Sequence, residues 1–204
     1  MGIGDALFAN AYDLLAGGVE KSVAKYRMAT AGMATGDVLE IGAGTGANLP
    51  YYRDDVRLTL LEPSPGMTKR LRKKLAMLGK DATTVLQTGE RLPFGDASFD
   101  AVVATLVLCS VGSLGAVLSE VRRVLRPHGA FYFYEHVAAA GGITRRAQNV
   151  LNPVWKLVVG GCNLNRETES AIKAAGFSAV EVVRFGLPIS PPIVRPSIVG
   201  VAWA

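Results

Sequence analysis

Cysteine is scarce in this chain, with only Cys109 and Cys162 among 204 residues. Two cysteines cannot build the set of disulfides that stabilises small secreted domains. Neither belongs to a CxxC pair or to the Cys/His spacing typical of a zinc site. The sequence therefore predicts a reducing compartment, the cytoplasm, and no metal site.

Long hydrophobic runs are missing as well. No stretch approaches the 18 or more uninterrupted apolar residues of a transmembrane helix. The opening residues lack the charged start, apolar block and cleavage site of a signal peptide. We therefore expect a cytoplasmic protein that touches a membrane peripherally at most.

A long block of basic residues is also absent, although Lys and Arg outnumber Asp and Glu by 22 to 17 and the pI is about 9.4. The densest cluster, over 69–74, has the spacing of a solvated helix face. We therefore expect a slightly basic enzyme with no nucleic acid partner.

What the chain does contain is a regular alternation of apolar runs and helical patterns, with half of its residues hydrophobic. Strands are expected at 37–41, 57–61, 83–87, 99–106 and 130–136, with helices after Gly46 and over 64–78 and 113–125. Such alternation predicts an α/β fold with a parallel sheet and helices on both faces.

After residue 137 the regular alternation of strands and helices ends. Helices are expected over 143–159 and 166–175, the second ended by Gly176, followed by β-like runs at 180–185 and 198–203. We expect one domain over 1–204: a helical lid segment (1–35), a cofactor-binding core (36–137), and an acceptor side of helices and terminal strands (138–204). An alternative for 4–35 is an amphipathic segment lying on a membrane.

The most informative stretch is 37–48, where an apolar run reaches Glu40 and then Gly42, Gly44 and Gly46. A strand, a turn without side chains and a helix start allow a ligand to lie directly on the backbone. Glu62 closes the next apolar run, 20 positions after Gly42, where an acidic residue can hold both ribose hydroxyls. An adenosine-type nucleotide is the predicted ligand.

The glycine pattern also satisfies the dinucleotide motif, so it does not by itself separate NAD from S-adenosylmethionine. Glu40 favours the second ligand, because a carboxylate two residues before Gly42 can meet the amino group of a methionine moiety and repels a pyrophosphate. An NAD-dependent oxidoreductase and a non-catalytic nucleotide-binding module remain alternatives.

Several motifs resemble those of class I methyltransferases. They are LEIGAGTG (39–46), LEPSPGM (61–67), LPF (92–94) with SFD (98–100), and EVRRVLRP (120–127). The resemblance implies a Rossmann-like fold, with a seven-stranded, mostly parallel sheet whose last strand is antiparallel. It also implies S-adenosylmethionine as donor and S-adenosylhomocysteine as product.

A second set of segments is similar to the short alkyl-thiol S-methyltransferases of animals. It comprises TLVLCSV (105–111), EHVA (135–138), PVWK (153–156) and GCNLNRET (161–168). This likeness implies that the acceptor is a small thiol or hydrogen sulfide. The animal proteins carry an N-terminal hydrophobic anchor that is absent here, and His128 stands where their turn has a glycine. A weaker likeness, chiefly at Tyr12 and Asp13, points to bacterial phosphatidylethanolamine N-methyltransferases, and methylation of that lipid is the alternative function.

These patterns define the candidate site residues. For the cofactor they are Glu40, Gly42, Gly44, Gly46, Asn48, Glu62, Pro63, Met67, Gly89, Glu90 and Leu106. Glu62 is expected on the ribose, Glu40 at the methionine ammonium, and Gly89 with Glu90 against the adenine.

For the acceptor we single out His136, Cys109 and Trp155. His136 ends a predicted strand on the edge where such sheets bind ligands, and a neutral imidazole can take a proton from a thiol. A small thiol also ionises appreciably near neutral pH, so a dedicated base is not essential. Trp155, with Leu157 and Val158, is expected to line or cover an apolar acceptor pocket.

Overall fold

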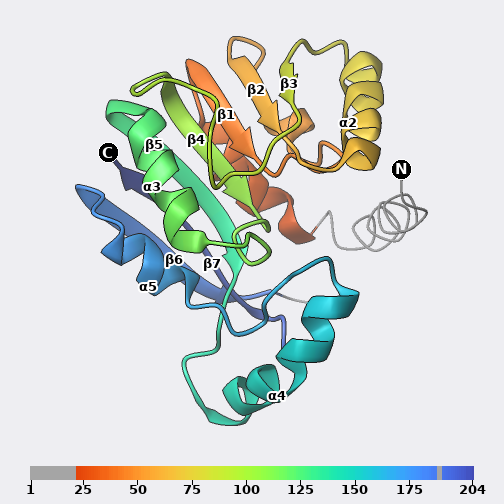
Figure 1. Cartoon of the computed structure of the whole chain (residues 1–204), viewed down its shortest axis with the longest axis vertical. Helices are drawn as coiled ribbons and strands as arrows, with labels where there is room; N and C mark the ends of the chain where they lie inside the picture. Colours follow the sequence, from red (N-terminus) through yellow and green to blue (C-terminus); the bar gives the residue numbers. More distant parts are fainter. Residues whose placement is uncertain (1–21, 188–189) are drawn as a thin grey trace.

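The computed structural model describes residues 22–187 and 190–204, and its centre is one seven-stranded sheet (Figure 1). The strand order is β3-β2-β1-β4-β5-β7-β6. The strands are β1 (Asp37–Ile41), β2 (Arg57–Leu61), β3 (Thr83–Val85), β4 (Phe99–Thr105), β5 (Leu125–His136), β6 (Ala179–Gly186) and β7 (Pro196–Trp203). Only β7 runs antiparallel to its neighbours β5 and β6 in this sheet. The predicted class I methyltransferase topology is confirmed.

Helices connect these strands. The described helices are α2 (Pro65–Leu78), α3 (Leu114–Val124), α4 (Gly142–Val158) and α5 (Thr168–Ala174), with single 3-10 turns η1 (Ala31–Met33) and η2 (Leu49–Tyr51). Ser64 caps α2 through its side chain, which accepts from the backbone N–H of Met67. Gly176 follows α5 with a φ of +80°, as the predicted stop requires.

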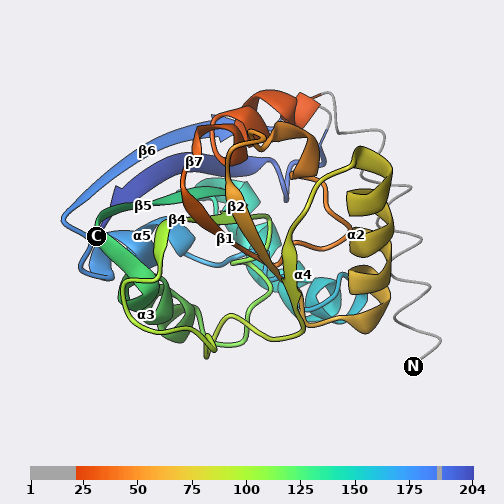
Figure 2. The same cartoon turned by 90° about the horizontal axis from the view of Figure 1, so that it is seen from above.

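Both faces of the sheet are buried, and alternate residues of β1 point to opposite sides. Leu39 and Ile41 pack in the cluster that includes the apolar residues of α3 and Ile172 of α5. Val38 packs instead with Leu71 and Leu75 of α2 and with the chain around η1 and η2. Figure 2 shows α3 and α5 on one side of the sheet and the segment before β1 on the other. Two-sided burial explains why the strands read as continuous apolar runs.

The largest difference from the expected elements lies at the start of β5. Residues 127–129, just before the strand expected at 130–136, form an irregularity inside a longer strand, where the pairing with β4 shifts between Phe99 and Ala101. His128 adopts a φ of +65° there. This left-handed conformation disfavours a residue with a Cβ and is adopted most readily by glycine.

Two shorter elements also differ from the expectation. β3 ends at Val85, two residues early, and the helix expected after Gly46 is only the turn η2. The lid expected over 1–35 is described only from residue 22, which starts a helical stretch over 22–28. Tyr12 and Asp13 lie outside the described residues. Across the residues that are described, no helix has the length and apolar character needed to cross a bilayer.

Candidate active site

The glycine turn lies at the carboxyl end of β1, between β2 and β4. Its glycines Gly42, Gly44 and Gly46 all have left-handed φ angles, between +57° and +86°. A Cβ on Gly42 would meet Val107 at 2.2 Å, and one on Gly46 would meet Leu49 at 2.7 Å. A Cβ on Gly44 would have no closer described neighbour than the Met67 sulfur at 4.0 Å. Gly42 and Gly46 therefore allow close packing, whereas Gly44 borders open space.

Glu62 joins the end of β2 to this turn. One oxygen of its carboxylate accepts from the backbone N–H of Gly44 at 2.9 Å, and the other accepts from that of Ser64 at 2.8 Å. Burial raises the pKa of Glu62, against the lowering effect of these two hydrogen bonds. Each oxygen can accept a further hydrogen bond, so two ribose hydroxyls can still be held here. Pro63, next along the chain, is exposed.

Glu40 belongs to a buried network that the sequence did not reveal. Its carboxylate accepts from Asn48 at 2.8 Å and from the hydroxyl of Tyr52 at 2.9 Å. Asn48 also donates to Thr105 at 2.9 Å and accepts from Arg27 at 2.7 Å. Burial raises the pKa of Glu40 to about 7, despite these hydrogen bonds and the positive charge of Arg27. The network ties the helical stretch before β1 to the ends of β1 and β4.

Sequence reasoning missed Arg27, Tyr52 and Thr105 as members of this network. Thr105 was detectable, because it ends β4 beside the glycine turn. Arg27 and Tyr52 carry no spacing signal, since they reach Glu40 from segments whose approach depends on the tertiary fold.

The loop after β4 is held by Glu135, which is fully buried at the end of β5. One carboxylate oxygen accepts from the backbone N–H groups of Val107 and Leu108, each at 2.8 Å. Burial raises the pKa of Glu135 to about 7. Leu106, at the start of the loop, has a φ of +54°, which costs a residue with a Cβ about 1–2 kcal/mol. These hydrogen bonds help to keep the backbone in that conformation.

The residues predicted against the adenine lie after β3. A Cβ on Gly89 would meet Ile41 at 3.0 Å, so this loop packs directly on the end of β1. Glu90 accepts from the backbone N–H of Gly112 at 2.8 Å and thereby fixes the segment before α3. The roles of Gly89 and Glu90 in cofactor binding stay predictions.

A cluster of two thiols and an imidazole forms beside this loop, and we call Cys109, His136 and Cys162 the CHC cluster. All three residues are buried, and their candidate ligand atoms lie within 4.8 Å of one another. Nε2 of His136 is 2.8 Å from Sγ of Cys162. Neither cysteine has the spacing of a metal site in the sequence, yet the structure brings these three candidate ligands together. Cys109 lies in the loop after β4, His136 ends β5, and Cys162 lies in the loop after α4. No short spacing in the sequence therefore predicts this cluster.

The surroundings hold the CHC cluster in place. The side-chain amide of Asn163 donates to the carbonyl of Cys109 at 2.9 Å. The indole N–H of Trp155 donates to Sγ of Cys162 at 3.4 Å. The neighbouring thiol of Cys109 and burial raise the pKa of Cys162 well above that of an ordinary thiol. Cys162 thus favours its neutral, protonated form.

α4 corrects part of the expected acceptor pocket. It lies beyond the carboxyl end of β5 (Figure 1), and Trp155 is partly buried against the CHC cluster. Leu157 and Val158, however, are 86% and 70% exposed. These two side chains point to solvent, so of the three residues expected at the acceptor pocket only Trp155 is partly buried. Arg145 pairs with Glu167 at 2.7 Å.

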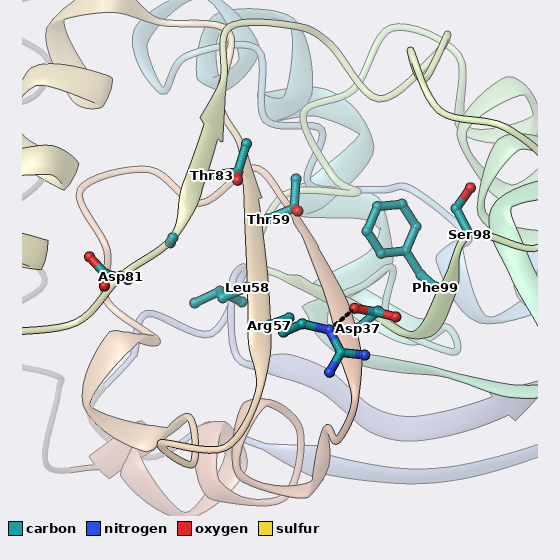
Figure 3. Close-up of a pocket in the computed structure, with 9 residues that line it drawn as sticks. Asp37, Arg57, Leu58, Thr59, Asp81, Thr83, Ser98 and Phe99 are labelled. Carbon is teal, nitrogen blue, oxygen red and sulfur yellow. Dashed lines mark hydrogen bonds and ion pairs between the residues drawn. The ribbon is translucent and has the colours of Figure 1, made fainter.

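A separate hollow of about 640 Å³ lies at the other end of the strands, near their amino ends (Figure 3). Its lining includes Asp37 and Arg57 at the amino ends of β1 and β2, and Phe99 at the start of β4. Arg57 and Arg126 form ion pairs with Asp37 and lower its pKa to about 2. Ligands of open α/β sheets bind at the carboxyl ends of the strands, so we place the active site at the glycine turn and not in this hollow.

Comparison with known proteins identifies the family of the chain. The model of the methyltransferase domain family matches residues 39–133. Thiol S-methyltransferase TMT1A of Homo sapiens is 44% identical over 169 residues, which cover 81% of this chain and 69% of that protein. Phosphatidylethanolamine N-methyltransferase of Cereibacter sphaeroides is 34% identical over 133 residues, covering 64% of this chain and 66% of that protein.

A solved structure shows the same fold. It is the SAM-dependent methyltransferase of Thermotoga maritima, described as a possible histamine N-methyltransferase. It superposes with a TM-score of 0.70 at 20% identity, over 97% of both chains. At 20% sequence identity, this structural similarity supports the fold only.

Proposed function

The chain belongs to the S-adenosylmethionine-dependent methyltransferases, in the family of the thiol S-methyltransferases, and we propose that it methylates the sulfur of a small, uncharged thiol or of hydrogen sulfide. Family membership decides against the NAD-dependent oxidoreductase and the non-catalytic module. The observation that carries the thiol assignment is the 44% identity to a thiol S-methyltransferase over 169 residues.

The donor lies along the carboxyl ends of β1 and β2. Glu62 accepts hydrogen bonds from the ribose hydroxyls while its hydrogen bond to Gly44 holds the turn open. The methionine ammonium lies near the negative charge of Glu40 and its partner Asn48. Gly89 and Glu90 border the adenine, and Met67 packs beside the nucleoside.

The acceptor lies at the neighbouring strand ends, between Leu106, Cys109, His136 and Trp155. Methyl transfer is an in-line displacement: the acceptor sulfur forms a bond to the methyl carbon, and the bond from that carbon to the sulfonium sulfur breaks. The released electron pair neutralises the sulfonium and leaves S-adenosylhomocysteine. Because the methyl group is already activated, the protein must supply mainly alignment and a deprotonated nucleophile. His136 is the side chain placed to act on the acceptor.

Incubation with methyl-labelled S-adenosylmethionine and a panel of thiols, amines and phenols tests this proposal. We expect the label in methyl thioethers, with one S-adenosylhomocysteine formed for each. Transfer to amines or phenols, with the thiols left unmodified, would overturn the thiol assignment.

A second candidate is N-methylation of phosphatidylethanolamine at a membrane surface. It draws support from the similarity to the Cereibacter sphaeroides enzyme and from the apolar face that α4 exposes. That face comprises Ile143, Val150, Val154, Leu157 and Val158, each at least 66% exposed. An amphipathic helix of this kind can lie in a lipid interface.

Phosphatidylethanolamine vesicles separate the two candidates. Vesicle binding that weakens with salt, together with labelled headgroup amine, would favour the lipid as acceptor. Methylation of added thiols with unlabelled vesicles would favour the thiol.

A further inference from the structure

We propose that Cys109, His136 and Cys162 bind one zinc ion whose fourth coordination position receives the acceptor thiol. This inference rests on the proposed function for the identity of that fourth ligand. The zinc site itself stands on the geometry of the CHC cluster.

The ligand set suits zinc. Two cysteine sulfurs and one imidazole nitrogen are preferred zinc donors, and three protein ligands with one open position characterise catalytic zinc sites. In a tetrahedral zinc site, donor atoms about 2.0–2.3 Å from the ion lie about 3.5–3.8 Å from one another. The three donor atoms here already lie within 4.8 Å of one another. The present 2.8 Å between His136 and Cys162 would open by about 0.7 Å to reach that tetrahedral spacing.

Nε2 of His136 faces the sulfur of Cys162, so it is the ring nitrogen that can share an ion with that sulfur. A bound cation would convert the two buried thiols to thiolates. The indole N–H of Trp155 already points at the sulfur of Cys162, and hydrogen bonds of this kind orient and stabilise metal ligands.

The supporting loops make the site rigid. Arg166 donates to the carbonyls of Leu108 and Val111, each at 2.7 Å, and so joins the loop carrying Cys162 to the loop carrying Cys109. Glu135, adjacent to His136, fixes the other side of the Cys109 loop.

The position matches the chemistry of the proposed reaction. Cys109 follows β4 and His136 ends β5, immediately beside the strand ends that carry the glycine turn. Zinc held by Cys109, His136 and Cys162 would lower the pKa of a bound acceptor thiol, whose proton would pass to solvent. Attack of that sulfur on the methyl carbon would break the bond from this carbon to the sulfonium sulfur, giving a thioether and S-adenosylhomocysteine. His136 acts in this scheme as a metal ligand and not as a base.

Metal analysis of the full-length protein, purified under reducing conditions and supplied with zinc, tests the site. We expect about one zinc ion per chain, and its loss in Cys109→Ser, Cys162→Ser and His136→Asn. His128→Ala is the matched control, because His128 is the only other histidine and lines a hollow near the amino ends of β4 and β5, away from the cluster. S-adenosylhomocysteine binding confirms that each variant is folded. Wild-type protein without zinc under these conditions would overturn the proposal.

Cobalt substitution tests the open position. We expect a thiolate-to-cobalt charge-transfer band, absent from the cysteine variants, and visible bands that change when a thiol is added. Visible bands that stay unchanged when the thiol is added would overturn the proposal that the thiol binds the metal.

Activity then separates the two proposals. We expect the zinc-free protein to methylate thiols roughly thirtyfold more slowly at neutral pH, since only a few per cent of a free thiol is ionised there. Undiminished thiol methylation without metal would overturn the catalytic role of zinc and leave the thiol function intact. A zinc-loaded protein that methylates no thiol would instead overturn the function and leave the metal site standing.

Discussion

The carboxylate of Glu62 accepts a hydrogen bond of 2.9 Å from the backbone N–H of Gly44. Through this contact the acidic end of β2 and the glycine turn after β1 form one rigid unit. The same carboxylate is the proposed holder of the ribose, so its loss should affect binding far more than folding.

Replacing Glu62 with alanine tests this dual role. Hydrogen bonds to a charged group contribute about 1.5–3 kcal/mol each, so we expect S-adenosylhomocysteine affinity to fall by at least about 2 kcal/mol, or roughly thirtyfold. Isothermal titration calorimetry measures the change. Glu181→Ala, at an exposed position of β6, is the control. Equal affinities for Glu62→Ala and the wild type would contradict the role of Glu62.

Alanine substitutions at Gly44 and Gly79 test whether the ligand occupies the space beside Gly44, because the two glycines have similar backbone conformations and surroundings. Both have left-handed φ angles, +57° and +62°, and neither has a described neighbour closer than 4.0 Å to an added Cβ. Alanine at either position should cost about 1–2 kcal/mol of stability. Only Gly44→Ala should also abolish S-adenosylhomocysteine binding, because its Cβ enters the ligand space. If both variants bind the ligand normally, the ligand does not lie on Gly44.

The raised pKa of Glu40 predicts a pH-dependent stability. Between the ordinary value of 4.5 and the folded-state value of about 7, the folded chain holds a proton that the unfolded chain has released. The stabilisation is complete below pH 4.5 and is lost as the pH rises through about 7. Relative to Glu40→Gln, the wild type should therefore lose about 2–3 kcal/mol of unfolding free energy between pH 4.5 and 8.

Urea unfolding of both proteins across this range measures the difference. Glu181→Gln, at an exposed position, should show the same change of unfolding free energy with pH as the wild type. A constant gap between the wild type and Glu40→Gln would show that Glu40 keeps an ordinary pKa.

Trp155→Phe probes the acceptor side without touching the donor site. Phenylalanine keeps an aromatic ring but cannot donate to the sulfur of Cys162. We expect a higher KM for the thiol acceptor and unchanged affinity for S-adenosylhomocysteine. Leu157→Ala, on the exposed face of the same helix, should change neither quantity. Steady-state kinetics with the thiol as varied substrate provide the comparison, and an unchanged KM in Trp155→Phe would place the acceptor elsewhere.

The sequence predicted the sheet and the glycine turn well, because both depend on local patterns. Strands buried on both faces give continuous apolar runs, and Gly42 to Gly46 and Glu62 follow the spacing of one β-turn-α unit. The start of β5 was missed because Pro127 to Gly129 resemble a turn, although the structure accommodates them as a break in strand pairing.

The CHC cluster and the Glu40 network could not be predicted in this way. Cys109, His136 and Cys162 meet only because β4 and β5 pair in a particular register and the loop after α4 folds back onto their ends. For α4 the sequence indicated a helix but not which of its side chains are covered, so Leu157 and Val158 were assigned to a pocket although both are exposed.

A crystal structure of the protein with bound S-adenosylhomocysteine tests the central claim most directly. The account predicts the nucleoside on the glycine turn, with the Glu62 carboxylate within hydrogen-bond distance of both ribose hydroxyls and the homocysteine sulfur facing Cys109 and His136. A saturated crystal with the turn empty, or with the ligand elsewhere and Glu62 away from the sugar, would contradict it.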